Sequence, residues 1–242
     1  MQEWLNKQAA DFVTAFVVDN RWKYIVEGIQ NTLILTFFAL ILGVVLGVIV
    51  AAVRSTYDKQ YKLMRMSIGK IFLWIANFIS KIYLTVIRGT PAMVQILIIF
   101  FIIMASSDNK MLCGIIAFGI NSGAYVAEII RSGIMSIDVG QSEAGRSLGF
   151  NYVQTMWYIV MPQAFKTILP TLANEFIVLL KETAIAGYVG VTDLTRGANI
   201  IRGVTYQSFW PLLAIAAIYL IMVMFFTWLV GRLERRLRSS ER

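Results

Sequence analysis

The chain has 242 residues, of which 58% are hydrophobic and only 15% are charged, and this balance excludes an ordinary soluble domain. It contains no histidine and a single cysteine, so it offers neither a His-based catalytic or zinc site nor an internal disulfide framework, and we expect no catalytic residue, metal or cofactor in this chain. A bilayer core of about 30 Å requires about 20 apolar residues per helix, which predicts an all-α, polytopic membrane protein with about four to six spans.

The N-terminal part combines an interfacial segment with the first clear span. Residues 1–30 scatter aromatic side chains among charges, which predicts an external amphipathic segment lying at the membrane interface. Residues 32–53 form a continuous apolar run that ends at Arg54. Within this run Gly43 and Gly47 lie four residues apart, a spacing that either brings two helices close together or only reflects the frequency of glycine in membrane helices.

The next stretch is too long for one span and is interrupted by Lys70, Lys81 and Arg88. We therefore assign residues 62–87 to a helix on the cytoplasmic side or at the interface, and residues 88–105 to the second span. An extra span within 62–87, giving six in total, stays open at this point.

The rest of the chain alternates apolar and polar stretches. Residues 111–130 are predicted to form the third span, 167–191 the fourth and 209–230 the fifth. Between the third and fourth spans lies the longest polar loop, 131–166, and between the fourth and fifth lies an external segment, 192–208. Five crossings place the two termini on opposite sides of the membrane.

Basic residues cluster beside the apolar runs and set the orientation. The net charge is +8, and residues 54–88 hold seven cations against Asp58 alone. Five further cations follow the last span: Arg232, Arg235, Arg236, Arg238 and Arg242. This distribution fits the positive-inside rule rather than a nucleic-acid groove, so the C-terminus is predicted in the cytoplasm and the N-terminus outside. The arginine tail is expected to contact lipid headgroups.

The long polar loop carries a spaced pattern. Its members are Glu143-Ala144-Gly145, Gly149, Ile159, Met161 and Pro162. The pattern resembles the EAA loop of bacterial ATP-binding-cassette (ABC) importer permeases, which reads Glu-Ala-Ala, three residues, Gly, nine residues, Ile-x-Leu-Pro. Gly145 replaces the third alanine and Met161 the leucine, and both changes keep the size class. Small residues permit close backbone approach and Gly149 a tight turn, as a helix seated in a partner's cleft requires. The alternative is a capped loop helix that contacts no other protein.

Three further segments extend the resemblance to the polar amino acid branch of these permeases over residues 30–235. They are Arg88-Gly89-Thr90-Pro91 with Gln95, Ser122-Gly123-Ala124-Tyr125 through Glu128 and Arg131, and Asn174-Glu175-Phe176 through Lys181-Glu182-Thr183. The resemblance implies the type I ABC importer fold, with five spans in a transmembrane domain of residues 31–242 and a cytoplasmic coupling loop at 131–166. It also implies that the loop pattern docks the ATPase, through Glu143, Ala144, Gly145, Gly149, Ile159 and Pro162.

The same resemblance implies a set of partners. These are cytoplasmic P-loop ATPase subunits that bind ATP and Mg²⁺, a second permease copy or homologue, an extracellular or periplasmic solute-binding protein, and a polar amino acid as substrate. The location that it implies is the bacterial cytoplasmic membrane, with multiple spans. The chain itself lacks the Gly-x-x-x-x-Gly-Lys-Ser/Thr sequence and so cannot be a P-loop ATPase, and the resemblance implies that ATP is hydrolysed on a partner subunit.

The fourth predicted span places polar groups in a hydrocarbon-length segment, where an unpaired charge is costly. Residues at three-, four- and seven-residue spacings share one helix face: Thr171, Asn174, Glu175, Val178, Lys181, Glu182 and Ile185. The helical neighbours of Lys181 include no acid, so its countercharge must come from another span, a second permease or a ligand.

An amino acid presents one carboxylate and one ammonium group, so a dry site for it should offer both charge signs and neutral hydrogen-bonding groups. We therefore predict a substrate path lined by Thr90, Gln95, Glu128, Asn174, Glu175, Lys181 and Glu182. The alternatives are that these residues form structural ion pairs between spans, or that Lys181 and Glu182 reach the outer interface.

Two other classes of protein remain to be separated from an importer. A secondary transporter would also carry membrane charges but has no need of the docking pattern, and a membrane scaffold would keep that pattern without a substrate site.

Overall fold

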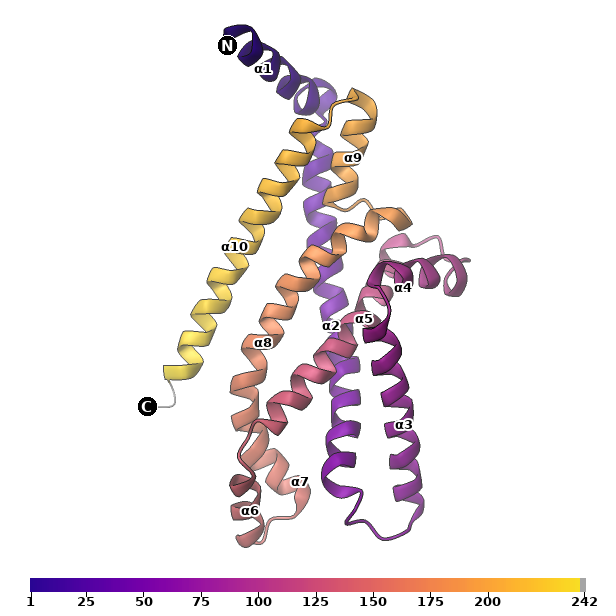
Figure 1. The fold of residues 1–242 in the computed structure, drawn as a ribbon, viewed down its shortest axis with the longest axis vertical. Helices are drawn as coiled ribbons and strands as arrows, with labels where there is room; N and C mark the ends of the chain where they lie inside the picture. Colours follow the sequence, from indigo (N-terminus) through magenta and orange to yellow (C-terminus); the bar gives the residue numbers. More distant parts are fainter. Residues whose placement is uncertain (240–242) are drawn as a thin grey trace.

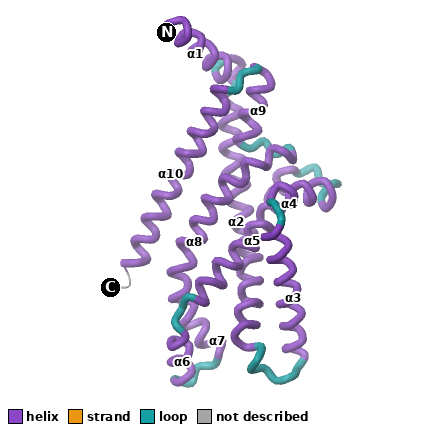
Figure 2. The backbone as a smooth tube through the Cα atoms, in the orientation of Figure 1, coloured by secondary structure: helices purple, strands orange, loops and turns teal. Residues whose placement is uncertain are grey.

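The computed structural model describes residues 1–239 as helices joined by short turns (Figure 1). These residues contain no strand, as Figure 2 shows, so the predicted all-α class is confirmed. Arg242 of the arginine tail and the side chain of Arg238 lie outside the described part. The elements in chain order are α1 (Gln2–Phe16), η1 (Val18–Asn20), α2 (Trp22–Gln60), α3 (Ile68–Gly89), α4 (Ala92–Ile98), η2 (Ile99–Ile103), α5 (Lys110–Met135), α6 (Val139–Ser147), α7 (Tyr152–Thr155), η3 (Met156–Val160), α8 (Met161–Glu182), η4 (Thr183–Val189), α9 (Leu194–Thr205) and α10 (Phe209–Ser239).

The long helices run between the two ends of the molecule. By length and composition α2, α3, α5 and α10 can each cross a membrane, and α8, which like α3 has 22 residues, runs alongside them (Figure 1). At about 1.5 Å per residue, a helix of that length reaches about 33 Å, close to the thickness of a bilayer core. The short helices α6 and α7 lie at the end where α2 turns into α3, and α1 and α9 lie at the opposite end (Figure 1).

The prediction for the second span is wrong. The 22-residue α3 is the helix long enough to cross a membrane, whereas residues 92–103 form a helical stretch of about 18 Å, too short to do so. Thr90 and Pro91 adopt extended backbone angles and separate the two, because proline has no N–H to continue the helix. Lys81 and Arg88 of α3 line a hollow of about 390 Å³ together with Arg54 and Glu128.

Other boundaries also shift. The first long helix begins at Trp22 rather than near residue 32, and its 39 residues reach about 58 Å, well beyond a bilayer core. Its first turns therefore lie outside the predicted span, where they pack against α9. The fourth predicted span begins earlier, at Met161, and its α-helix ends at Glu182, followed by the 3-10 turn η4.

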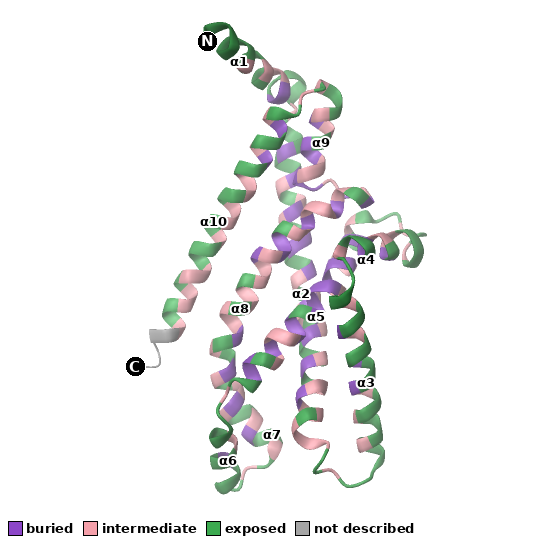
Figure 3. Ribbon diagram, viewed as in Figure 1, coloured by how far each residue is buried: buried purple, intermediate pink, exposed green. Residues whose placement is uncertain are grey.

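The core runs along the contact between α2 and α5, the most extensive between any two helices of the described chain. Figure 3 shows buried residues concentrated on these two helices, while α3 and α10 are largely exposed. Gly43 and Gly47 face α5: a Cβ on Gly43 would lie 3.1 Å from Ser122 Cβ, and one on Gly47 would collide with the Val126 side chain. Of the two interpretations of this glycine pair, close helix packing is therefore confirmed.

Replacement of Gly47 by alanine should lower the stability of the purified complex. The added methyl would meet Val126 and come within 3.0 Å of the Ala127 backbone nitrogen, and such overpacking costs about 1–3 kcal/mol. Gly231→Ala in α10, where a Cβ meets nothing within 4 Å, is the matched control. The measurement is the thermal unfolding midpoint in detergent, and equal midpoints for the two variants would contradict the packing described.

Candidate functional site

The helix α6 is terminated at both ends by local hydrogen bonds. At its start the Asp138 carboxylate accepts from the Gly140 N–H (2.7 Å). At its end the Gly149 N–H donates to the Arg146 carbonyl (2.9 Å) and the Phe150 N–H to the Gly145 carbonyl (3.1 Å), the pattern of a Schellman motif. Gly149 has φ +84°, a conformation that glycine adopts without strain, which explains its place in the docking pattern.

The small residue Gly145 allows α6 to lie close against the following π-helix, η3. A Cβ at this position would lie 2.7 Å from Ile159 Cδ1 and 3.0 Å from Thr155 Cγ2. Gln163, in the first turns of α8, donates to the Gln141 side chain (3.1 Å) and adds a polar link between α6 and α8. The predicted docking residues Gly145 and Ile159 thus form the internal support of the loop.

Glu143 and Ala144 are exposed on α6 and remain available to another protein. Pro162 lies in the first turn of α8, where a missing N–H costs nothing. The docking pattern therefore divides into supporting residues and a free face.

A second short helix, α7, joins this unit to α2. Asn151 and Gln154 form a reciprocal capping box, with each side chain accepting from the other residue's N–H (2.9 and 3.0 Å). Burial raises the pKa of the Tyr152 phenol above its ordinary value, while a hydrogen bond with Thr56 of α2 opposes the shift. The phenol is therefore protonated at neutral pH and is a neutral hydrogen-bonding group.

A polar belt crosses the middle of the molecule. The Gln95 amide nitrogen donates to the Thr90 hydroxyl (2.8 Å) and to the Ile87 carbonyl (2.7 Å), and the Gln95 amide oxygen accepts from Asn121 (2.9 Å). The Thr90 hydroxyl in turn donates to the Val86 carbonyl (2.8 Å). Thr90 and Gln95 thus satisfy carbonyls freed where α3 breaks. That task is structural, and their contact with a substrate stays a prediction.

The belt continues from α5 to α8. The Ser122 hydroxyl donates to Glu175 Oε1 (2.9 Å), so the carboxylate predicted on α8 faces the residue next to Asn121. Asn121 is 3% exposed, and its side-chain oxygen has no hydrogen-bond partner among the described residues. The belt therefore contains a half-buried acid, Glu175, and a buried acceptor that has no partner among the described residues, the Asn121 oxygen.

Glu128 belongs to a separate ion network. Its carboxylate lies 3.7 Å from Arg88 Nη1 of α3 and 3.3 Å from Arg131 Nη2 on its own helix. Arg131 also lies 3.8 Å from Asp58 of α2. This chain of charges joins three helices, as the structural alternative for Glu128 anticipated.

The remaining predicted site residues make fewer polar contacts within the described chain. Asn174 and Lys181 are exposed, and in the part of the chain that the structure describes neither has an ion pair or a side-chain hydrogen bond. Glu182 is half-buried at the end of α8. The predicted site thus divides into the belt around Glu175, the Glu128 network, and open positions on α8.

Two residues of the polar belt, Asn121 and Ser122, were not among the predicted substrate-path residues. Ser122 stands within a segment of family resemblance, and Asn121 precedes it, so a buried polar pair inside an apolar span was the available signal.

Comparisons with known proteins give a consistent result. Residues 43–239 match the model of the family described as "Binding-protein-dependent transport system inner membrane component". The chain is 35% identical over 221 residues to the arginine transport system permease protein ArtQ of Bacillus subtilis (strain 168), covering 90% of this chain and 94% of that protein. It is 38% identical over 217 residues to the putative glutamine transport system permease protein GlnP of Rickettsia typhi, covering 88% and 93%.

A solved structure shares the same fold. A crystal structure of an amino acid ABC transporter with histidines matches with a TM-score of 0.78 and 42% sequence identity, over 91% of this chain and 98% of that one.

Proposed function

Because the chain belongs to the family of binding-protein-dependent transport system inner membrane components, it is a permease subunit of an amino acid ABC transporter, and we propose that it imports a polar amino acid by alternating access while a separate subunit hydrolyses ATP. It is a multi-pass protein of the inner membrane. The relatives named for arginine and glutamine support a polar substrate.

The proposed topology has five crossings, by α2, α3, α5, α8 and α10. The N-terminus then lies outside and the C-terminus in the cytoplasm. Two features support this orientation: the cations of the α2–α3 turn lie at the same end as α6, and Arg232, Arg235 and Arg236 lie in the last turns of α10 (Figure 1). In this arrangement α1 is an external interfacial helix, and α9 packs on the external end of α2.

The observation that carries the proposal is the construction of α6. Its ends are fixed by local hydrogen bonds and its back rests on η3, yet Glu143 and Ala144 face outward. A rigid helix that exposes Glu143 and Ala144 suits transfer of motion from a cytoplasmic P-loop ATPase, which carries ATP and Mg²⁺. Closure of the ATPase pair would then bias the permease between outward and inward states.

The proposed substrate path follows the polar belt and the open face of α8. Glu175 offers negative charge and the Asn121 oxygen a free acceptor, both suited to an ammonium group. Lys181, unpaired in the described chain, offers the positive charge for a carboxylate. Delivery by an external solute-binding protein and pairing with a second permease copy or homologue complete the proposed assembly.

Reconstitution tests the function. Proteoliposomes holding the permease with its ATPase and solute-binding protein should take up labelled amino acid only when ATP reaches the ATPase. Uptake driven by an ion gradient without ATP would instead indicate a secondary transporter. Stable ATPase docking without any uptake would indicate a scaffold, and either result would refute the importer.

A further inference from the structure

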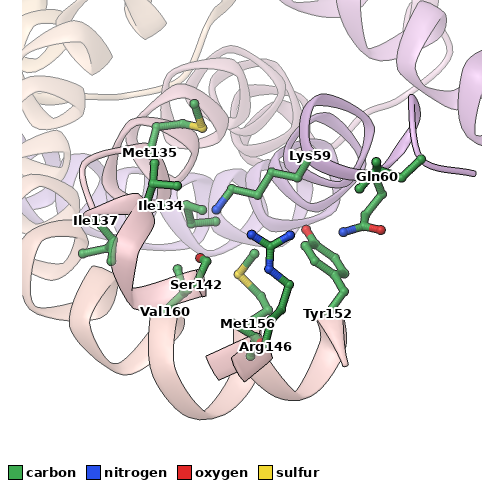
Figure 4. Close-up of a pocket in the computed structure, with 13 residues that line it drawn as sticks. Lys59, Gln60, Ile134, Met135, Ile137, Ser142, Arg146, Tyr152, Met156 and Val160 are labelled. Carbon is green, nitrogen blue, oxygen red and sulfur yellow. The ribbon is translucent and has the colours of Figure 1, made fainter. Parts of the chain in front are cut away.

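A cavity of about 300 Å³ lies where α6 meets the ends of α2 and α5 (Figure 4). Lys59 and Gln60 come from α2, Ile134 and Met135 from α5, and Arg146 from α6. Any occupant would therefore contact both the helix bundle and the docking helix.

The polar part of the cavity is positively charged. Figure 4 shows the ends of the Lys59 and Arg146 side chains converging on one space, with the Tyr152 hydroxyl beside them. Among the described residues, none of those that line the cavity is acidic. Asp58, which precedes Lys59 in the sequence, lies 3.8 Å from Arg131 instead. In the described part of the chain neither Lys59 nor Arg146 forms an ion pair. Two like charges that face one space repel each other until an anion binds between them.

The rest of the cavity is apolar. Ile134, Met135, Met156 and Val160 line it, together with Leu63 of the α2–α3 turn. A free amino acid suits such a site poorly, because its ammonium group would find no carboxylate. A phosphate group joined to an apolar body matches both parts of the lining.

We propose that this cavity binds a phosphate-bearing anion between Lys59 and Arg146, with an anionic phospholipid of the inner leaflet as the source that the apolar lining favours. The proposal rests on the proposed orientation, in which this end faces the cytoplasm. The Gln60 amide and the Tyr152 hydroxyl add neutral groups beside the two cations. The bound anion would hold α6 against the bundle, so lipid composition would modulate coupling.

The test measures lipid binding without transport, so its outcome is independent of whether import occurs. The delipidated permease–ATPase complex is titrated with phosphatidylglycerol, phosphatidylcholine or inorganic phosphate and followed by native mass spectrometry. The variant is Lys59→Gln with Arg146→Gln. The control, Lys62→Gln with Arg65→Gln, removes the same charge from exposed positions of the neighbouring turn that do not line the cavity.

Phosphatidylglycerol should bind the cavity variant about thirtyfold more weakly than the wild type, because each cation near a lipid surface contributes about 1 kcal/mol. Lys59→Gln alone, which leaves α6 unchanged, should show about a fivefold loss, so the proposal stays testable if the double variant misfolds. The control should bind nearly as tightly as the wild type.

Other outcomes separate the sources and the alternatives. If inorganic phosphate binding is lost in the cavity variant while phosphatidylglycerol binding is unchanged, the site takes the free anion. Equal binding of every probe to the cavity variant and the control would overturn the proposal. It would also be overturned if only retention of the ATPase fell, since the two cations would then serve a carboxylate of that partner.

Discussion

Replacement of Gly145 by leucine is expected to reduce ATP-driven amino acid uptake by about 5- to 150-fold. A side chain here points at Ile159 and Thr155, where even a Cβ has contacts of 2.7 and 3.0 Å, so leucine must push α6 away from η3. Overpacking of this kind costs about 1–3 kcal/mol. If the displaced α6 binds the ATPase more weakly by this free energy, uptake falls by about 5- to 150-fold. Uptake into proteoliposomes and co-purification of the ATPase are the two measurements.

Gly145→Ala is the matched control. Its single methyl would lie 2.7 Å from the flexible end of Ile159, which can turn aside, and alanine stands at this place in the docking pattern. The alanine variant should therefore retain most of its uptake. Equal uptake by the leucine and alanine variants would show that close packing of α6 on η3 does not matter for coupling.

Glu175→Gln should lower uptake by about 10- to 150-fold while the complex still assembles. Glutamine keeps the shape and can still accept the hydrogen bond that Ser122 now donates to the carboxylate (2.9 Å), so the main change is the loss of negative charge. A hydrogen bond to a charged group contributes about 1.5–3 kcal/mol. If Glu175 binds the substrate ammonium, losing this free energy lowers uptake by about 10- to 150-fold. The measurements are the concentration dependence of uptake and substrate-stimulated ATP hydrolysis.

Two controls separate charge from structure. Ser122→Ala removes the hydrogen bond but keeps the carboxylate, so it should affect uptake less than Glu175→Gln. Glu27→Gln changes an exposed acid in the first turns of α2 and should leave uptake unchanged. Transport kinetics equal to the wild type in Glu175→Gln would exclude this residue from the substrate path.

The docking loop was the most predictable part of the molecule. Its pattern is local: Gly149 terminates a helix through hydrogen bonds to the preceding turn, and Gly145 meets Ile159 only fourteen positions later. Short-range rules of capping and small-residue packing are therefore enough to anticipate the shape, although which surface residues contact the partner is not encoded in the same way.

The second span was mispredicted because charge was weighed without its surroundings. Lys81 and Arg88 argued against a membrane helix, but they line a hollow with Glu128, and Asn77 of the same helix accepts from Arg54 (2.7 Å). Such compensation comes from residues distant in the sequence. The same holds for the link between Ser122 and Glu175, 53 positions apart, which no periodicity within one helix can reveal.

The single long helix α2 is a rigid connection between the two ends of the permease. The helix contains no proline; at one end Gly28 abuts Leu194 of α9, and at the other Lys59 borders the cavity beneath α6. A stiff rod of about 58 Å that pivots by about 5° displaces its far tip by about 5 Å. A small tilt imposed at the Lys59 end would therefore reach the Gly28 end as a movement the size of a side chain, with no need for a relay of intermediate contacts.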